Sequence, residues 1–282
     1  MKIIVTGAKG QLGYDVVLQL KKSGHTAIEA DLPELDITDK SAVEAFFEVH
    51  KPDGVIHCAA YTNVDGAETE KELCEKINSD GTKNIAECCK KSNSKLIYIS
   101  TDYVFDGKGI KPFETDAATA PCNYYGETKL MGENAVKEIC DKYFIVRISW
   151  VFGSNGKNFV KTMLRLSEER NELTVVCDQV GSPTYTPDLA ALLCDMIETE
   201  KYGIYHATNE GFCSWAEFAA EIMKLSGAET KIIPVTSSEY KTVAKRPANS
   251  RMSKESLDNA GFGRLPHWQD AHERIHSNEL KK

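Results

Sequence analysis

Apolar and polar positions alternate in blocks along the first half of the chain. Short apolar runs with little internal alternation, typical of strands buried on both faces, lie at 3–5, 26–28, 54–56, 95–99 and 144–146. Between them, apolar residues recur three or four positions apart and predict helices at about 11–23, 39–50, 66–92 and 122–140. This order predicts an α/β fold, a Rossmann-type doubly wound parallel sheet with right-handed crossovers.

The rhythm is less regular after residue 150. Helices are predicted near 157–170, 187–199, 214–226 and 268–280, and strands near 173–176 and 203–206. We therefore expect a dinucleotide-binding domain over 1–150, completed by part of 172–200. The remainder of 151–282 would form a smaller substrate-binding domain. Long polar connections at 101–121 and 236–253 are expected over the carboxyl edge of the sheet, where such folds bind ligands.

A glycine-rich turn follows the first predicted strand and opens a helix. Gly7 allows a tight turn, Gly10 lets the backbone approach a pyrophosphate, and Gly13 permits close packing of helix on sheet. The amides of Gln11 and Leu12 would then face the phosphates at the positive end of the helix dipole. A purely structural turn is the alternative, because the spacing is GxxGxxG rather than GxGxxG.

Acidic residues near the second strand fit an adenosine site. Asp31 lies 18 residues beyond Gly13, about where a carboxylate binds the ribose hydroxyls. A carboxylate repels a 2′-phosphate, so Asp31 favours NADH over NADPH. Asp36 and Ile37 would border the adenine, with a solvated loop aspartate and a core isoleucine as the alternative.

Tyr125 and Lys129 lie four residues apart in a predicted helix, so they share one helix face. A neighbouring ammonium lowers the pKa of a phenol from its usual value near ~10. Such a tyrosine exchanges a proton with a carbonyl or alcohol oxygen while a nicotinamide exchanges hydride with the carbon. Thr101, at the end of the fourth strand, would bond the same oxygen; a simple capping role is the alternative.

Together these motifs resemble the extended short-chain dehydrogenases/reductases and, within them, the dTDP-4-dehydrorhamnose reductase family. The resemblance extends to the segments 57–65, 100–107, 147–153, 181–184, 246–250 and 265–268. It implies that a sugar nucleotide, dTDP-4-dehydro-β-L-rhamnose, is reduced at C4 by NADPH or NADH. By position, Tyr125 donates the proton, Lys129 lowers the pKa of Tyr125 and holds the nicotinamide ribose, and Thr101 polarises the carbonyl.

The resemblance also implies the residues that line each ligand. The cofactor would contact Gly7, Gly10, Gln11, Leu12, Gly13, Asp31, Asp36, Ile37, Ala59, Ala60 and Tyr61, besides Tyr125 and Lys129. The sugar would contact Thr62, Val64, Asp102, Val104, Phe105 and Trp150, besides Thr101 and Tyr125. Arg246 is a candidate pyrophosphate partner, since a guanidinium suits paired oxygens, with a surface salt bridge as the alternative.

Two features limit which properties of the family can be expected of this chain. Some members of the family are dimers with Mg²⁺ held by acidic residues; the matching positions here are Asp15 and Asp188, so Mg²⁺ is possible but not predicted. Monomer and homodimer both stay open. Sugar-nucleotide 4,6-dehydratases carry a glutamate where this chain has Tyr103, which favours simple reduction. An epimerase, or a non-catalytic subunit similar to the regulatory β subunit of methionine adenosyltransferase, are the other interpretations.

A zinc-protease pattern, HExxH, occurs at His272–His276 near the end of the chain. Only Glu279 follows as a further ligand, too close in sequence for the usual arrangements. We therefore interpret it as chance and predict no metal site.

Composition narrows the class of protein. The formal charge of −8 argues against a nucleic-acid binder, which would show a basic stripe. Nine cysteines without a CxxC motif argue against a disulfide framework and favour a reducing compartment. The chain starts directly on a strand pattern and has no long apolar run, so we expect a cytoplasmic protein with no membrane contact.

Overall fold

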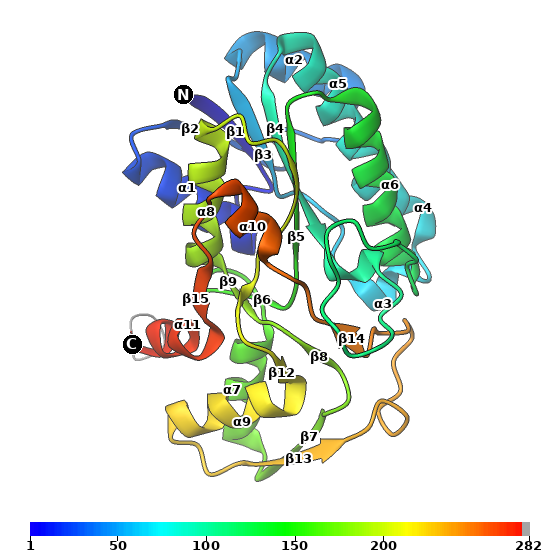
Figure 1. Cartoon of the computed structure of the whole chain (residues 1–282), viewed down its shortest axis with the longest axis vertical. Helices are drawn as coiled ribbons and strands as arrows, with labels where there is room; N and C mark the ends of the chain where they lie inside the picture. The colour runs from blue at the N-terminus through cyan, green and yellow to red at the C-terminus, as the bar shows by residue number, and fades with distance from the viewer. Residues whose placement is uncertain (278–282) are drawn as a thin grey trace.

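Six parallel strands form the central sheet of the computed structural model, which describes residues 1–277 (Figure 1). Their order across the sheet is β10-β5-β4-β3-β1-β2. The bounds are β1 Lys2–Thr6, β2 Thr26–Ala30, β3 Gly54–His57, β4 Lys95–Thr101, β5 Tyr143–Ile148 and β10 Gly203–His206. All neighbouring pairs are parallel, and the strand order reverses beside β1, which confirms the doubly wound α/β fold.

Helices cover both faces of this sheet (Figure 1). One apolar core joins the strands to α1 (Gln11–Lys22) and α8 (Thr186–Glu198). A second core on the other face joins them to α2 (Lys40–His50), α5 (Thr82–Ser92) and α6 (Tyr124–Ile139). Because the inner strands β1, β3, β4 and β5 are buried on both faces, they read as continuous apolar runs in the sequence.

The predicted helix over 66–92 is broken in the structure. It consists of α3 (Val64–Ala67), α4 (Lys71–Glu75), a π-helical turn at Lys76–Gly81 and α5. The wide turn buries Asn78, whose side chain bonds the backbone of Tyr61 and the hydroxyl of Thr128 on α6. The π turn adds a residue to one helical turn, and it is too short to have a pattern of its own, so the apolar pattern alone does not reveal it.

The second part of the chain packs a separate apolar core below the sheet. It contains α7 (Phe159–Glu169), α9 (Trp215–Ser226), α11 (Trp268–Ile275) and the parallel pair β7 (Glu172–Val176) and β13 (Lys231–Val235). A final helix is predicted over 268–280. The structure shows it as α11 followed by a π turn up to residue 277, and residues 278–280 lie outside the described part of the chain. The chain re-enters the main layer through α8, which lies within the expected 172–200, and through β10, which follows just beyond it.

Several short elements are missing from the sequence prediction. Most of them are strands of two residues. β6 (Val151–Phe152) pairs with β9 (Thr184–Tyr185), and β8 (Val180–Gly181) pairs with both β12 (Cys213–Ser214) and β14 (Asn249–Ser250). A further pair is β11 (Asn209–Glu210) with β15 (Leu265–His267), and α10 spans Glu255–Ala260. Elements this short show no periodicity, because tertiary contacts and not their own pattern define them.

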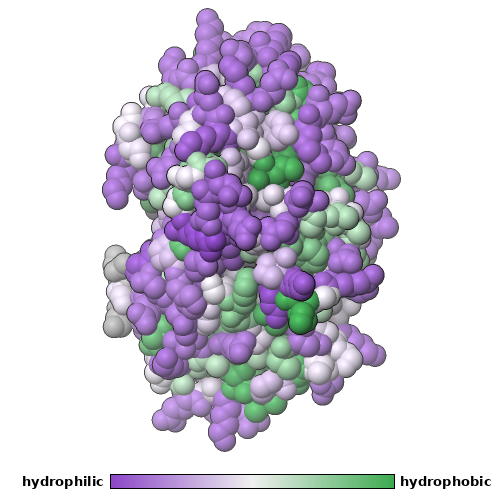
Figure 2. Space-filling view, in the orientation of Figure 1, coloured by the Kyte–Doolittle hydropathy of each residue, from purple (hydrophilic) through white to green (hydrophobic). Residues whose placement is uncertain are grey.

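The outer surface is mainly hydrophilic in the view of Figure 2, with hydrophobic residues near its middle and, in its lower part, over α9 and β13. Among residues 1–277, no helix is both long and apolar enough to span a bilayer.

Gly13→Ala is expected to destabilise the fold. A Cβ at this position would lie 2.1 Å from the carbonyl oxygen of Gly7, a backbone atom that cannot move without shifting α1 off the sheet. We expect the free energy of unfolding to fall by about 1–3 kcal/mol, the usual effect of overpacking, in urea titrations followed by circular dichroism. Gly263→Ala, where a Cβ meets no atom within 4 Å, is the control and should change stability by less than about 0.5 kcal/mol. Equal effects of the two substitutions would contradict this interpretation.

Candidate active site

The glycine-rich turn brings three backbone segments into contact at the carboxyl end of β1. Gly7 adopts a left-handed φ of 62°, and a Cβ on it would lie 2.8 Å from the backbone nitrogen of Ala59 after β3. Gly10 is the N-cap of α1, and no side chain caps the helix there. The amides of Gln11 and Leu12 therefore begin a bare helix N-terminus, which suits the phosphates of a dinucleotide.

A loop from the second part of the chain closes over this turn. Asn155 donates its side-chain amide to the carbonyls of Lys9 and Gly10 at 2.8 and 3.1 Å. The side chain of Gln11 in turn donates to the carbonyl of Val151 at 3.1 Å. The predicted phosphate site is thus bordered by both parts of the chain.

Asp31 lies at the end of β2 beside this turn, where the sequence placed the adenosine ribose. One oxygen accepts the backbone N–H of Lys9 and the other that of Leu32, each at 2.9 Å. The Lys9 ammonium lies in the same loop, bonded to Glu34 and to the carbonyl of Leu32, each at 3.0 Å. The sequence argument for NADH overlooked Lys9, whose charge stands close to the carboxylate that was expected to repel a 2′-phosphate.

The remaining predicted cofactor residues have identifiable structural partners. Asp36 accepts the N–H and hydroxyl of Thr38 at 2.9 and 2.8 Å, and Ile37 is part of the core beneath β1. Ala59, Ala60 and Tyr61 follow β3 directly, and Tyr61 donates its hydroxyl to Glu70 at 2.5 Å. That hydrogen bond raises the pKa of Tyr61 to about 12, so its phenol stays neutral. The adenine and nicotinamide roles remain predictions.

Thr101 and Tyr125 come from different elements that meet at the edge of the sheet. Thr101 ends β4, and its hydroxyl donates to Asp102 at 3.0 Å and accepts the N–H of Tyr103 at 3.2 Å. Tyr125 stands in the first turn of α6, where the side chain of Asn123 caps the helix. A Cβ on Gly126 would lie 2.2 Å from the Tyr103 carbonyl, so this glycine lets α6 approach the Thr101 segment.

The phenol of Tyr125 is more weakly acidic than a free tyrosine. Burial and the nearby Asp102 carboxylate raise its pKa above the usual range, and the Thr101 hydroxyl opposes them only partly. Asp102 is itself buried, and burial raises its pKa to about 6. Its Oδ2 has no hydrogen-bond partner that meets normal geometry among the described residues.

Lys129 lies one turn beyond Tyr125 and is buried, with its Nζ 4.2 Å from the centroid of the Tyr98 ring. Burial lowers the pKa of Lys129 to about 7, against the opposing effect of Glu133. The lowering of the Tyr125 pKa that the sequence led us to expect is not found in the chain alone. The ammonium is itself desolvated, and burial dominates the environment of the phenol.

The predicted sugar residues differ in how deeply they are buried. Thr62 is exposed and Val64 half-buried at the start of α3, beside Tyr61. Val104 and Phe105 are fully buried and pack with Met252, so they lie beneath the site and not on its surface. Trp150, at a φ of 50°, stacks on Trp215 with ring centroids 3.8 Å apart.

Arg246 crosses from the long second connection to the catalytic segment. It donates to the Tyr103 hydroxyl at 3.2 Å and to the Asp65 carboxylate at 2.9 Å. Asp65 also accepts the backbone N–H of Ala244, which fixes this connection against α3. Arg246 therefore forms an ion pair, the alternative role that the sequence offered for it, next to the candidate catalytic residues, and its contact with a pyrophosphate stays a prediction.

Neither candidate metal site gathers enough ligands among residues 1–277. Asp188 is bound by both terminal nitrogens of Arg274 at 2.7 Å, and Asp15 accepts the hydroxyl of Thr186. In the HExxH segment, His272 is buried, and burial lowers its pKa to about 4. Glu279 lies outside the described residues.

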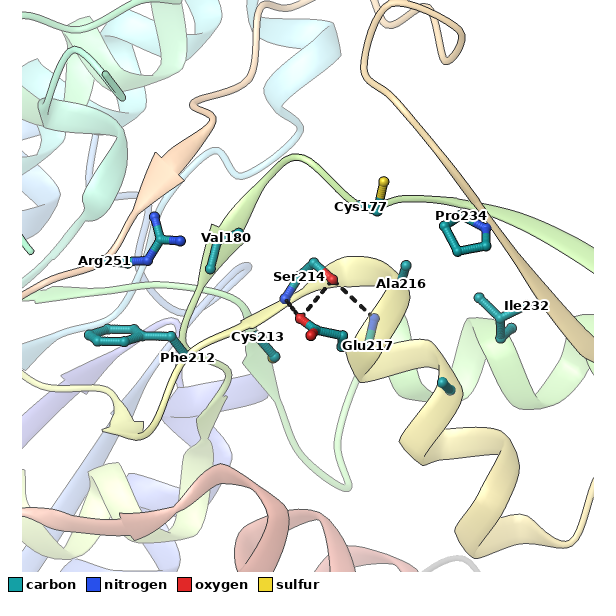
Figure 3. A pocket seen from close by; sticks show the side chains of 11 residues that line it. Cys177, Val180, Phe212, Cys213, Ser214, Ala216, Glu217, Ile232, Pro234 and Arg251 are labelled. Atoms are coloured by element: carbon teal, nitrogen blue, oxygen red, sulfur yellow. Dashed lines mark hydrogen bonds between the residues drawn. The ribbon is translucent and has the colours of Figure 1, made fainter. Parts of the chain in front are cut away.

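A cavity of about 630 Å³ opens at the start of α9 (Figure 3). Apolar groups line most of it, with Arg251 at one side, and in the figure Ser214 and Glu217 form the reciprocal cap of α9 at its floor. Thr101, Tyr125 and Lys129 are not among its lining residues. The cavity is therefore distinct from the site of these three candidate catalytic residues.

Comparison with known proteins agrees with this geometry. The family model described as the RmlD substrate binding domain matches residues 1–280. A dTDP-4-dehydrorhamnose reductase of Aggregatibacter actinomycetemcomitans is 41% identical, over 97% of this chain and 98% of that protein. The spore coat polysaccharide biosynthesis protein SpsK of Bacillus subtilis is 42% identical, over 96% of this chain and 95% of that protein.

Solved structures give the same result. The dTDP-4-dehydrorhamnose reductase of Bacillus anthracis, in complex with NADP, is 43% identical with a TM-score of 0.96 and 98% of both chains covered. The ortholog from Clostridium acetobutylicum is 42% identical with a TM-score of 0.97 and both chains covered fully. The chain therefore belongs to the RmlD substrate binding domain family, that of the dTDP-4-dehydrorhamnose reductases.

Proposed function

We propose that this protein reduces the C4 keto group of dTDP-4-dehydro-β-L-rhamnose to give dTDP-β-L-rhamnose, with NADPH or NADH as the hydride donor. The observation that carries the proposal is that Thr101, Tyr125 and buried Lys129 lie at the same carboxyl edge of the sheet as a bare helix N-terminus. We infer that it acts in the cytoplasm, which agrees with its nine free cysteines.

The residues present fit a dinucleotide. The uncapped start of α1 offers amides to the pyrophosphate, and the carboxyl ends of β1, β2 and β3 surround it. When bound, the nicotinamide supplies a hydride to the C4 carbon. Lys129, buried one turn from Tyr125, would hold the nicotinamide ribose.

Tyr125 supplies the proton for the C4 oxygen. Because the pKa of this phenol is raised, it keeps its proton at neutral pH, which is the state that a general acid needs. The charge that develops on the carbonyl oxygen during hydride transfer is met by the hydroxyls of Tyr125 and Thr101. Thr101 is held at the end of β4 by its hydrogen bonds to Asp102 and Tyr103.

Stoichiometric loss of nicotinamide absorbance with dTDP-4-dehydrorhamnose is the direct test. A sugar-nucleotide epimerase retains its nicotinamide and shows no net loss. A regulatory subunit would turn over no dTDP sugar and would co-purify with a synthetase. Either outcome would replace the proposal.

Tyr125→Phe is expected to lower kcat by about 10²- to 10⁴-fold, because the general acid is removed. The affinity for NADPH, measured by fluorescence titration, should be largely kept. Tyr124→Phe is a matched control: Tyr124 is its neighbour on α6, but its hydroxyl donates to Glu75 at 2.6 Å. Undiminished turnover in Tyr125→Phe, or equal losses in both variants, would remove Tyr125 from the mechanism.

Lys9→Ala is expected to weaken NADPH binding by about tenfold and to leave NADH binding unchanged, since only NADPH carries a 2′-phosphate for the ammonium to meet. Glu34→Gln should have the opposite effect, because it releases Lys9 from its ion pair. Dissociation constants of both cofactors for the three proteins are the measurement. A parallel change for NADH and NADPH would show that Lys9 supports only the shape of the loop.

A further inference from the structure

Glu133 is a fully buried carboxylate that the proposed chemistry does not use. It lies on α6 one turn beyond Lys129 and two turns beyond Tyr125, so the three side chains share one helix face. Its Oε1 accepts the Ser100 hydroxyl at 2.6 Å and Arg147 Nε at 2.8 Å, and its Oε2 accepts Arg147 Nη2 at 2.8 Å. This paired geometry fixes orientation as well as distance.

The partners of Glu133 stand at the ends of two neighbouring strands. Ser100 immediately precedes Thr101 in β4, and Arg147 lies opposite Ser100 in β5. One carboxylate therefore fixes α6, which carries Tyr125, against the strand that carries Thr101. A slide of the helix along the sheet would break all three hydrogen bonds.

Arg147 extends the same contact into the long connection that follows Thr101. Its Nη1 donates to the carbonyl of Thr115 at 3.0 Å, and its guanidinium carbon lies 5.0 Å from the centroid of the Phe105 ring. The segment beneath the sugar site is thus held by the same ion pair that holds α6.

Glu133 also supplies negative charge near Lys129. The ionisable and aromatic groups that interact with the Lys129 ammonium come from several elements: Glu133 on α6, His57 and Cys58 at the end of β3, Cys74 on α4 and Tyr98 on β4. Glu133 is the carboxylate of this set, and it favours the charged form of Lys129.

We propose that Glu133 is a positioning residue for the reduction: through it α6 holds Tyr125 at Thr101, and its carboxylate places a negative charge one helical turn from Lys129. The proposal rests on the function proposed above. Burying an ion pair adds little net stability compared with apolar packing, so its measurable effect is expected in geometry and charge.

The charge role is tested by the pH dependence of NADPH affinity, measured by fluorescence without any sugar. A charged Lys129 holds the cofactor, so affinity is present at low pH and is lost as pH rises through the pKa of Lys129. Glu133→Gln removes the favourable charge, lowers that pKa, and should move the loss of affinity to lower pH by about one unit. Glu138→Gln, on the exposed face of α6, is the control and should match the parent protein.

The geometric role is tested with Ser100→Ala, which removes one hydrogen bond and leaves every charge in place. We expect kcat to fall by about tenfold or more, because small misplacements of reacting groups are costly, with the pH dependence of NADPH affinity unchanged. A folded Glu133→Gln protein with the parent pH dependence, or Ser100→Ala with the parent kcat, would overturn the proposal. If Glu133→Gln does not fold, Ser100→Ala alone decides.

Different measurements would reject the proposed function and the proposed role of Glu133. Absence of turnover in the parent protein with dTDP-4-dehydrorhamnose would reject the proposed function, and the sugar-free binding measurement would still decide the charge role of Glu133.

Discussion

The buried ion pair between Glu133 and Arg147 joins α6, β4, β5 and the connection after Thr101. Backbone hydrogen bonds pair β4 with β5, and the Tyr98 hydroxyl of β4 donates to the Lys129 carbonyl of α6. Much of the remaining contact between α6 and the sheet is apolar, and apolar contacts resist separation better than sliding. The directional bonds of a carboxylate and a guanidinium resist sliding. The position of a phenol on one element relative to a hydroxyl on another therefore depends on a polar contact placed inside the apolar layers.

Individual cations and backbone amides must bind the anionic ligands, because the chain as a whole carries a formal charge of −8 and repels them. The cations near the candidate site are already engaged: Lys9 with Glu34, Arg246 with Asp65, and Lys129 within a buried pocket. A phosphate that binds Lys9 or Arg246 must compete with a carboxylate for the same cation. Such competition lowers affinity for anions in general and favours a ligand that makes several contacts at once.

Much of the fold could be predicted from the sequence, since buried parallel strands and amphipathic helices have strong patterns. Some of the candidate site was recognisable because its residues are close in sequence or follow a predicted strand. The glycines of the turn recur at a fixed spacing, Tyr125 and Lys129 lie one helical turn apart, and Thr101 ends a predicted strand. Lys9 and Glu133 were not, because their meaning depends on Glu34, Ser100 and Arg147, which only the folded chain brings near. The π turn around Asn78 and the two-residue strands were also hidden, since neither has a period of its own.

The single hydroxyl proton of Thr101 limits how the site changes when a carbonyl arrives. In the structure this proton is donated to Asp102 at 3.0 Å. Thr101 cannot donate to Asp102 and to a carbonyl oxygen together, so polarising the substrate takes a hydrogen bond away from the buried Asp102 carboxylate. A buried carboxylate left in this way binds a proton more readily, and burial has already raised the pKa of Asp102 to about 6. A sugar hydroxyl that donates to Asp102 would replace the hydrogen bond that Thr101 gives up. Thr101 can therefore polarise the carbonyl most easily when the substrate also carries a hydroxyl group near Asp102.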